Sequence, residues 1–368
     1  VAMPPRRLPY VLDVLDQVEP VLSRRWVEEM AEADDPAVRA LALDRLEQGA
    51  STPAPVPSAP SAELLWDVDP KRRRRALALA GRAGSPELWP RLVDELTVGE
   101  NAKVAAEGLV GLGPPALPLL EQSLRRFEGD AVMEPRILRV VGRIPGPEAD
   151  RLLFKLAGHP RRGLAFAALT LLTRRGCRAP ASLRGSLVEK MERMIDRVAW
   201  LSAAKVDLDG TSEAAELVAT LDAEIREDRM ALLLLLGLLT EPQGVELLRE
   251  HLEDGVGEVR AYALEVADVV VPPEVKPILL PVLERLPAAD TVRWLAARFP
   301  QPQLGAAGRV REILRHGGAQ VASWPRAVAV DTWMHLPQRE PCDELPANLY
   351  HPDPLVAELV ARALFKLD

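Results

Sequence analysis

Apolar and small residues recur along this chain at helical spacing, in repeats of about thirty residues. In residues 259–264, Arg260 is followed by small or apolar side chains three and four positions later. Residues 38–43 and 292–297 show the same order. Offsets of three, four and seven place side chains on one face of an α-helix. Each repeat therefore predicts a helix with one buried stripe.

Eleven repeats can be marked by the residue at this arginine position. Neighbouring marks lie 27 to 36 residues apart, and eight of the eleven are arginine. Self-similarity at a period in this range is typical of solenoids, which stack one supersecondary unit end to end. The marks are Arg39, Arg75, Ala102, Glu134, Arg162, Arg197, Arg229, Arg260, Arg293, Arg326 and Ala357.

This pattern resembles the HEAT repeat, whose second helix typically reads Val-Arg-x-x-Ala-Ala-x-Ala-Leu. The likeness is clearest at residues 356–364, 259–264 and 38–43, and it covers about residues 34 to 368. Ala102, Glu134 and Ala357 depart from it by replacing the arginine. Membership of the HEAT/armadillo-like superfamily implies an all-α fold, an α-solenoid of about eleven HEAT-like helix pairs forming a curved superhelix. That superfamily consists mostly of binding scaffolds, with a few enzymes that act on nucleic acids.

Composition and proline positions divide the chain into three parts. We expect residues 1–49 to form an N-terminal helical cap and the first repeat, residues 50–60 a linker rich in proline, alanine and serine, and residues 61–368 the repeat array. No stretch alternates with the period of two that a strand requires. Many of the 34 prolines stand at expected corners between helices, as at 113–115 and 146–147.

Charge and cysteine content restrict the classes of function. The net charge of −8 disfavours a general nucleic-acid binder, which needs clustered positive charge. Cys177 and Cys342 stand far apart and form no metal or redox motif, which favours a reducing compartment. The longest apolar run, residues 230–239, is too short to span a bilayer. We therefore expect a cytoplasmic protein, and its start at Val1 suggests that flanking sequence is missing.

The chain shows no pattern of residues that predicts catalysis. His335, Cys342 and His351 lie around a proline-rich loop without the close pairing that zinc sites favour. Asp207 and Asp209 resemble a calcium loop only weakly, and a helix break with a cap at Thr211 or Ser212 explains them better. We therefore predict no catalytic, cofactor-binding or metal-binding residue.

The repeated arginines favour a structural role. Position zero lies within about 15° of the centre of the face formed by positions three, four and seven, so each arginine should start beneath its helix. A charge there requires a carboxylate or carbonyl partner. This predicted arginine ladder consists of Arg39, Arg75, Arg162, Arg197, Arg229, Arg260, Arg293 and Arg326.

Positions two, five and nine lie opposite the buried stripe and should face an inner groove. In three successive repeats these positions are apolar or small, which suggests a partner-binding groove; burial by superhelical curvature or by another part of the chain would explain the same pattern. The groove positions are Leu164, Ala167, Leu171, Ala199, Ser202, Val206, Ala231, Leu234 and Leu238. The preceding repeat carries Arg136, Arg139 and Arg143 there, a basic rim suited to an amphipathic helix with acidic flanks.

The sequence thus favours a non-enzymatic scaffold or adaptor that binds a protein partner through its central repeats. One alternative is a nucleic-acid-binding solenoid similar to the HEAT-like DNA glycosylases, which would use the basic first half of the chain. A second alternative is a cytosolic regulatory array of a larger bacterial transporter or signalling protein. The partner's identity and the oligomeric state stay open.

Overall fold

The computed structural model describes most of the chain after residue 86. Described are residues 26–27, 29–31, 33, 35, 38–39, 42, 73–74, 76–78, 80, 86–97, 99–240, 245, 248, 265–269, 271–316, 321–337 and 342–367. The expected linker at 50–60 and the repeat marks Arg75 and Arg260 lie outside these residues. Contacts divide the chain into an N-terminal part, residues 1–92, and a C-terminal part, residues 93–368.

The described residues are helical or lie in turns, and none of them forms a strand. The expectation of an all-α protein is therefore confirmed for this portion. In the N-terminal part, Val27 and Ala42 are buried together, with Met30 and Ala31 packed against them. Arg39 donates from Nη1 to the carbonyl of Ala33 at 3.1 Å, and its side chain stays exposed.

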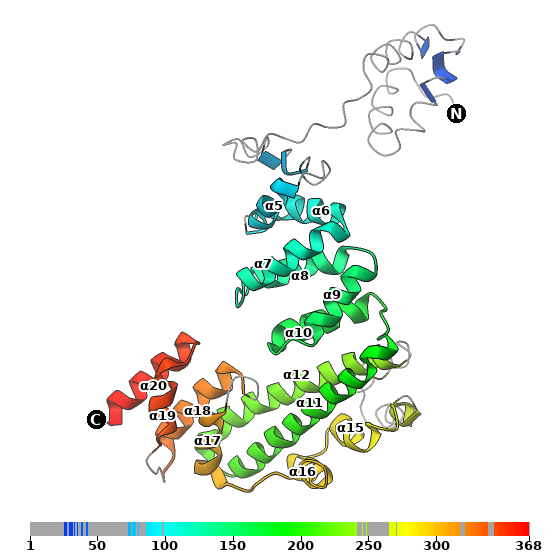
Figure 1. The fold of residues 1–368 in the computed structure, drawn as a ribbon. Coiled ribbons are helices and arrows are strands. Elements are labelled where there is room, and N and C mark those ends of the chain that lie inside the picture. The colour runs from blue at the N-terminus through cyan, green and yellow to red at the C-terminus, as the bar shows by residue number, and fades with distance from the viewer. Residues whose placement is uncertain are drawn as a thin grey trace. The chain divides into compact units, whose positions relative to one another are not determined.

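The described residues of the C-terminal part form a series of α-helices (Figure 1). After α5 (Trp89–Glu95), which begins in the N-terminal part, the first group is α6 (Ala102–Leu112), α7 (Leu117–Arg126), α8 (Met133–Arg143), α9 (Pro147–Ala157) and α10 (Arg162–Arg174). Two long helices follow, α11 (Ala181–Leu208) and α12 (Ala215–Leu239). The last group is α15 (Lys276–Leu283), α16 (Ala288–Leu295), α17 (Gly305–Arg315), α18 (Ser323–His335), α19 (Glu344–Ala347) and α20 (Pro354–Leu367).

Glycine–proline corners end and start helices where the sequence predicts them. Gly113 and Gly146 have φ values of +68° and +105°, which side chains rarely adopt. Each is followed by a proline that begins the next helical segment, the short 3₁₀ helix η4 (Pro114–Ala116) or α9. A proline in the first turn loses no helical hydrogen bond, because that N–H has no partner within the helix.

The helices from α6 to α12 pack in two layers. Successive members of one layer, α6, α8, α10 and α12, contact one another, while α7 and α9 contact each other and cover α8. Fully buried leucine and isoleucine side chains, such as Leu109, Ile137 and Leu153, fill the space between the layers. The apolar stripes read from the sequence therefore face the interior in this region.

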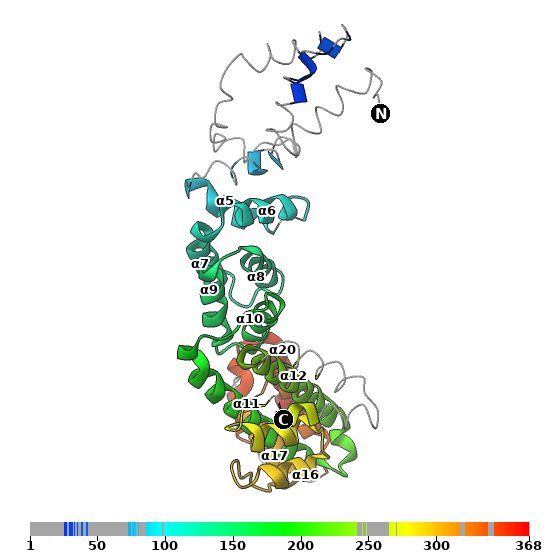
Figure 2. The same ribbon diagram turned by 90° about the vertical axis from the view of Figure 1, so that its right-hand side faces the viewer.

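The two central helices are twice as long as a repeat helix requires. Arg197 and Arg229, expected near the start of separate repeat helices, lie in the middle of α11 and α12. Both helices are nearly free of glycine and proline, so nothing in their sequences ends them earlier. They pack against each other; α11 also contacts α15, α16 and α17, and α12 also contacts α10 and α18 (Figure 2).

The turn between these helices corrects one prediction. The chain breaks at Gly210, with φ +75°, but neither Thr211 nor Ser212 caps the following 3₁₀ helix η5 (Ser212–Ala214). Ser212 instead donates to the carboxylate of Glu213 at 2.9 Å. The expected break is present, and the expected cap is wrong.

Among the described residues, no helix combines the length and the apolar character needed to cross a bilayer.

Candidate functional site

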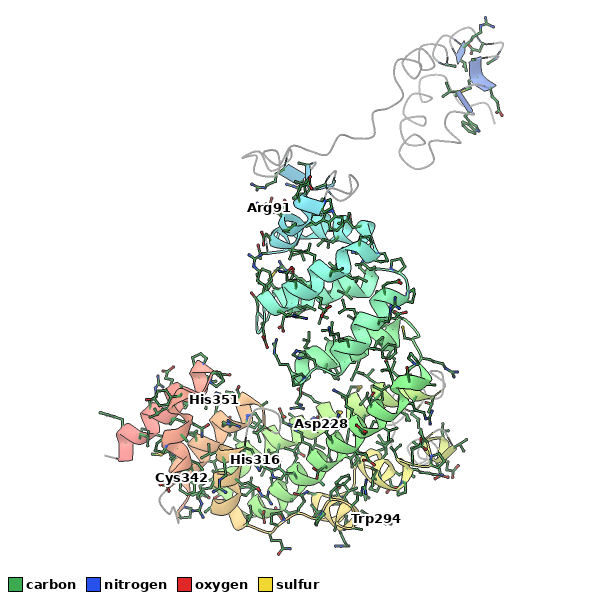
Figure 3. The ribbon with its side chains drawn as sticks, in the orientation of Figure 1. Arg91, Asp228, Trp294, His316, Cys342 and His351 are labelled. Carbon is green, nitrogen blue, oxygen red and sulfur yellow. The ribbon has the colours of Figure 1, made fainter. Side chains whose placement is uncertain are left out.

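Four charged residues of the C-terminal part form one group, which we call the central ion cluster: Arg162, Arg197, Glu224 and Asp228. Arg197 donates to Glu224 and to Asp228, and all three side chains are buried. Arg162, at the start of α10, donates to the same two carboxylates and lies 2.9 Å from Asp228 Oδ1. Two arginines thus neutralise two acids where α10, α11 and α12 meet (Figure 3).

The other described members of the arginine ladder differ in environment. Arg229 donates from Nε to the carbonyl of Val282 at 2.8 Å. Arg293 is 77% exposed and pairs with Asp290 one turn earlier on α16. Arg326 is buried, and no described carboxylate pairs with it. The six described arginines of the ladder therefore do not form one row of equivalent cations.

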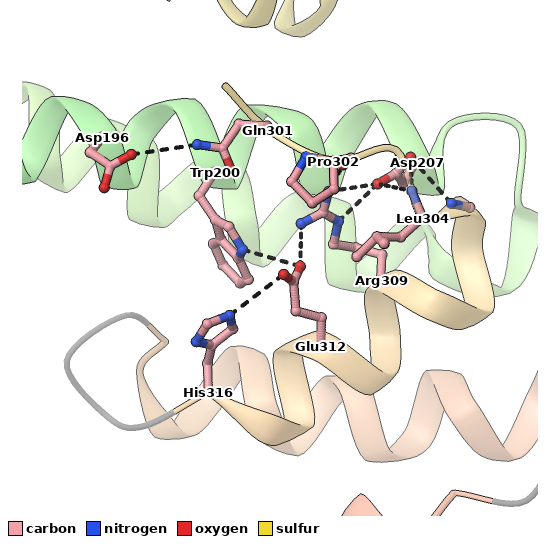
Figure 4. A network of polar contacts seen from close by, with 10 residues as sticks. Asp196, Trp200, Asp207, Gln301, Pro302, Leu304, Arg309, Glu312 and His316 are labelled. Carbon is pink, nitrogen blue, oxygen red and sulfur yellow. Dashed lines mark hydrogen bonds and ion pairs between the residues drawn. The ribbon is translucent and has the colours of Figure 1, made fainter. Parts of the chain in front are cut away.

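A second buried network joins the end of α11 to the start of α17 (Figure 4). The side chain of Arg309 is fully buried, and its Nη2 lies 2.7 Å from Asp207 Oδ2. Asp207 also accepts hydrogen bonds from the backbone N–H groups of Leu304 and Gly305, at 3.2 and 3.3 Å. Asp207 therefore caps a helix that begins about one hundred residues later in the chain, a role for which its own segment carries no signal.

Glu312 extends this network. Arg309 and the indole Nε1–H of Trp200 both donate to Glu312 Oε2, the latter at 3.1 Å. The His316 ring stands edge-on to Trp200, with ring centroids 5.2 Å apart. These groups satisfy one another's hydrogen bonds, so this network fastens α17 to α11.

The nine groove positions do not share one environment. The side chains of Leu164, Ala199, Ser202, Ala231, Leu234 and Leu238 are buried. Ala167 and Leu171 are partly exposed, and Val206 is exposed. The groove prediction assumes that each helix packs through one face only. Helices α11 and α12 instead have neighbouring helices on several sides. Six of the nine positions are therefore packing residues in the described structure.

The three arginines of the predicted basic rim also differ in their environments. Arg136 is partly buried and donates to the carbonyls of Leu96 and Thr97. Arg139 and Arg143 are exposed, and Arg139 donates from Nε to the carbonyl of Pro135 at 3.2 Å. Other arginines of the first half pair with acids: Arg125 with Glu121, Arg126 with Asp94, Arg161 with Glu134 and Arg175 with Asp150.

His335, Cys342 and His351 do not converge, and no group of metal-ligating side chains occurs among the described residues. His335 lies exposed at the end of α18. Cys342 donates a hydrogen bond to Glu344 Oε2 at 3.4 Å, and burial together with this carboxylate raises the pKa of the thiol to about 11. His351 accepts a hydrogen bond on Nδ1 from the backbone N–H of Asp353 at 3.0 Å.

A cavity of about 430 Å³ opens among the last helices, and we call it the C-terminal cavity. Its walls come from the end of α17, the first turns of α18, α19, and the 3₁₀ helix η6 (Asn348–Tyr350) with the residues that follow it. Arg326, His316 and His351 line it, with Asn348 and Tyr350. His316 and His351 are labelled in Figure 3. The sequence identifies Arg326 only as a repeat arginine. Its place in the cavity could not be predicted, because the residues that surround it come from distant turns.

Large apolar side chains are exposed on the same helices. Trp324 on α18, Tyr350 on η6 and Phe365 on α20 are 54%, 93% and 83% exposed, and we call these three the aromatic set. Leu349 and Leu355 are exposed beside them in the sequence. Helix α18 packs against α20, and α20 packs against η6, so one helical assembly carries all three aromatic side chains.

Searches of family models, of curated proteins and of solved structures find no match to this chain.

Proposed function

We propose that this chain is a non-enzymatic helical-repeat scaffold that binds a protein partner. Two layers of helices between α6 and α12 support the repeat interpretation. In this proposal the array follows the HEAT-like plan of about eleven helix pairs in a curved superhelix, and α11 with α12 form an enlarged pair within it. The buried acids and bases of the central ion cluster support a non-catalytic role, because each is occupied by an internal ion pair.

The observation that carries the proposal is the exposure of the aromatic set. The chain has only 15 tryptophan, tyrosine and phenylalanine residues, so leaving three large rings in water on one assembly of helices is costly. Tryptophan and tyrosine are enriched at the centres of protein interfaces, where they contribute most of the binding energy. An amphipathic helix is a suitable partner segment, because its apolar stripe can cover such rings.

The first-half arginines give less support to a nucleic-acid-binding function. A phosphate contact requires a cation that is free to replace counterions. Arg161, Arg162 and Arg175 are each engaged by carboxylates within the fold.

Capture of the partner by an interface-deficient variant tests the proposal. The variant Trp324→Ser/Tyr350→Ser/Phe365→Ser is compared with Val132→Ser/Val269→Ser, which removes exposed apolar side chains from other segments. Full-length proteins are immobilised and incubated with native lysate, and bound proteins are quantified by mass spectrometry. We expect one partner to fall at least tenfold on the aromatic variant only, with circular dichroism and the Tm unchanged. Equal capture of every bound protein by the unaltered chain and by both variants would contradict the proposal.

A further inference from the structure

The C-terminal cavity contains a buried arginine, Arg326, that pairs with no carboxylate of the described residues. The Arg326 side chain is 5% exposed and donates to the carbonyl of His316 and, at 3.5 Å, to Asn348 Oδ1. Its Nε is buried and has no hydrogen-bond partner among the described residues. A guanidinium has five N–H donors, and neutral oxygens accept only part of this capacity here. Burying a cation without an opposite charge is unfavourable, so such a group indicates a missing anion.

The neighbouring charges do not supply that anion. Arg315 and Glu344, both in the cavity wall, pair with each other at 2.5 Å. His316 faces Glu312, which already receives hydrogen bonds from Arg309 and Trp200. The pKa of Arg326 is lowered by burial alone, with no carboxylate to offset it. Within the described part of the chain, no acid therefore compensates the positive charge of Arg326 at this cavity.

His351 provides a second donor on the same wall. Because its Nδ1 accepts the N–H of Asp353, a neutral His351 carries its proton on Nε2. Asn348 is fixed by its own donations to the carbonyls of Leu314 and Glu344, at 2.9 and 2.8 Å. The donors around the cavity are thus held in place before any ligand arrives.

We propose that the C-terminal cavity binds a ligand through a single carboxylate group, which pairs with Arg326 and accepts a hydrogen bond from His351. The volume of about 430 Å³ lies within the range of small-ligand sites. One uncompensated cation suits a monoanion, whereas a phosphate dianion would also meet the carboxylates of Asp343 and Glu344 at the cavity. This inference goes beyond the proposed scaffold function and does not depend on the aromatic set.

The test uses benzoate as the probe and benzamide as its neutral analogue, at constant ionic strength, with the full-length chain. The ring resonances of the five histidines are followed by NMR, and the signal of His351 is identified by its loss in His351→Gln. Benzoate is expected to shift this signal saturably and benzamide is not. Arg326→Gln should weaken benzoate binding at least tenfold, while the control Arg293→Gln, on an exposed arginine of α16, should leave it unchanged.

A second measurement keeps the proposal testable if Arg326→Gln does not fold. In the unaltered protein, a bound carboxylate offsets the charge of Arg326, so benzoate should raise the pH at which His351 titrates and benzamide should not. Equal responses to both probes, no response to benzoate, or full binding by Arg326→Gln would overturn the proposal. Comparing benzoate with an N-acetylated triglycine acid and its amide then shows whether the carboxylate of a small acid or of a peptide end is preferred.

Discussion

Arg309 and Asp207 form a buried ion pair through one carboxylate oxygen: Nε donates to Oδ2 at 2.9 Å, and Nη2 lies 2.7 Å from the same atom. The arginine is fully buried at the start of α17, and the aspartate lies near the end of α11. The pair therefore connects α17 to α11, one of the two long central helices. Arg309 also pairs with Glu312, whereas Asp207 would lose its arginine partner if Arg309 were removed.

Asp207→Ala is expected to destabilise the protein by about 2–4 kcal/mol, because it removes one of the two carboxylates that pair with Arg309 and leaves the N–H groups of Leu304 and Gly305 without a cap. Asp209→Ala is the matched control, since Asp209 is exposed and accepts only from the neighbouring Gly210. Urea unfolding of both variants measures the free energies. If the two variants lose the same free energy of unfolding, the Asp207–Arg309 pair does not stabilise the packing of α17 on α11.

Two members of the arginine ladder should differ strongly in their contribution to stability. Arg197→Met leaves Glu224 and Asp228 facing Arg162 alone, and we expect a loss of about 3–5 kcal/mol. Arg293→Met removes an exposed cation paired within one helical turn, and we expect a change within about 0.5 kcal/mol. Calorimetric Tm values and denaturant midpoints compare the two. A large effect at Arg293 would mean that the ladder acts uniformly, contrary to the environments described above.

Structural features that depend on neighbouring residues can be predicted from the sequence, whereas features that depend on distant contacts cannot. Gly113 and Gly146 with their following prolines predict corners, because backbone conformation at a turn depends mainly on the residues in it. The capping role of Asp207 could not be predicted, since its partners Leu304 and Gly305 are brought to it by the packing of α17 on α11.

The burial of the groove positions also depends on packing between helices that are distant in the sequence. Helical spacing predicts that Ala199 and Leu234 lie on a different face from the repeat stripe. It does not reveal that further helices cover that face, which is why both side chains are buried. Arg326 likewise fits the repeat pattern, and only the assembled turns show that it faces a cavity without a carboxylate partner.

Gly142→Ala should gain less stability than Gly185→Ala. A Cβ at Gly142 of α8 would lie 2.6 Å from Cδ2 at the end of the Leu171 side chain, so Leu171 would have to rotate, and this adjustment offsets the helix propensity that alanine adds. A Cβ at Gly185 of α11 meets nothing within 4 Å, and alanine there should stabilise the helix by about 0.5–1 kcal/mol. Thermal unfolding distinguishes the two. Adding Leu171→Ala to Gly142→Ala should remove the collision, and an equal effect of Gly142→Ala with and without Leu171→Ala would show that no collision occurs.

Cys342 should react slowly with iodoacetamide in the folded protein. Its pKa of about 11, against 9.0 for an unperturbed thiol, makes the reactive thiolate about 100-fold less abundant at neutral pH. Burial also raises the pKa of Cys177. Mass spectrometry after timed alkylation at pH 7.5 should show slow modification at both positions in buffer and fast modification in urea. Rapid labelling of Cys342 in the folded protein would contradict the environment assigned to it.

His351 is expected to make the protein less stable as the pH falls. Burial lowers the pKa of His351 below the ordinary 6.5, and the positive charge of Arg326 lowers it further. The unfolded chain therefore takes up a proton at a higher pH than the folded chain does, so stability is greatest above pH 6.5 and declines as the pH falls towards the folded pKa. His351→Gln cannot be protonated, so its stability should decline less between pH 7.5 and 5 than that of the unaltered protein. Denaturant unfolding across this range measures the difference, and parallel curves for the two proteins would exclude His351 as the source of the loss.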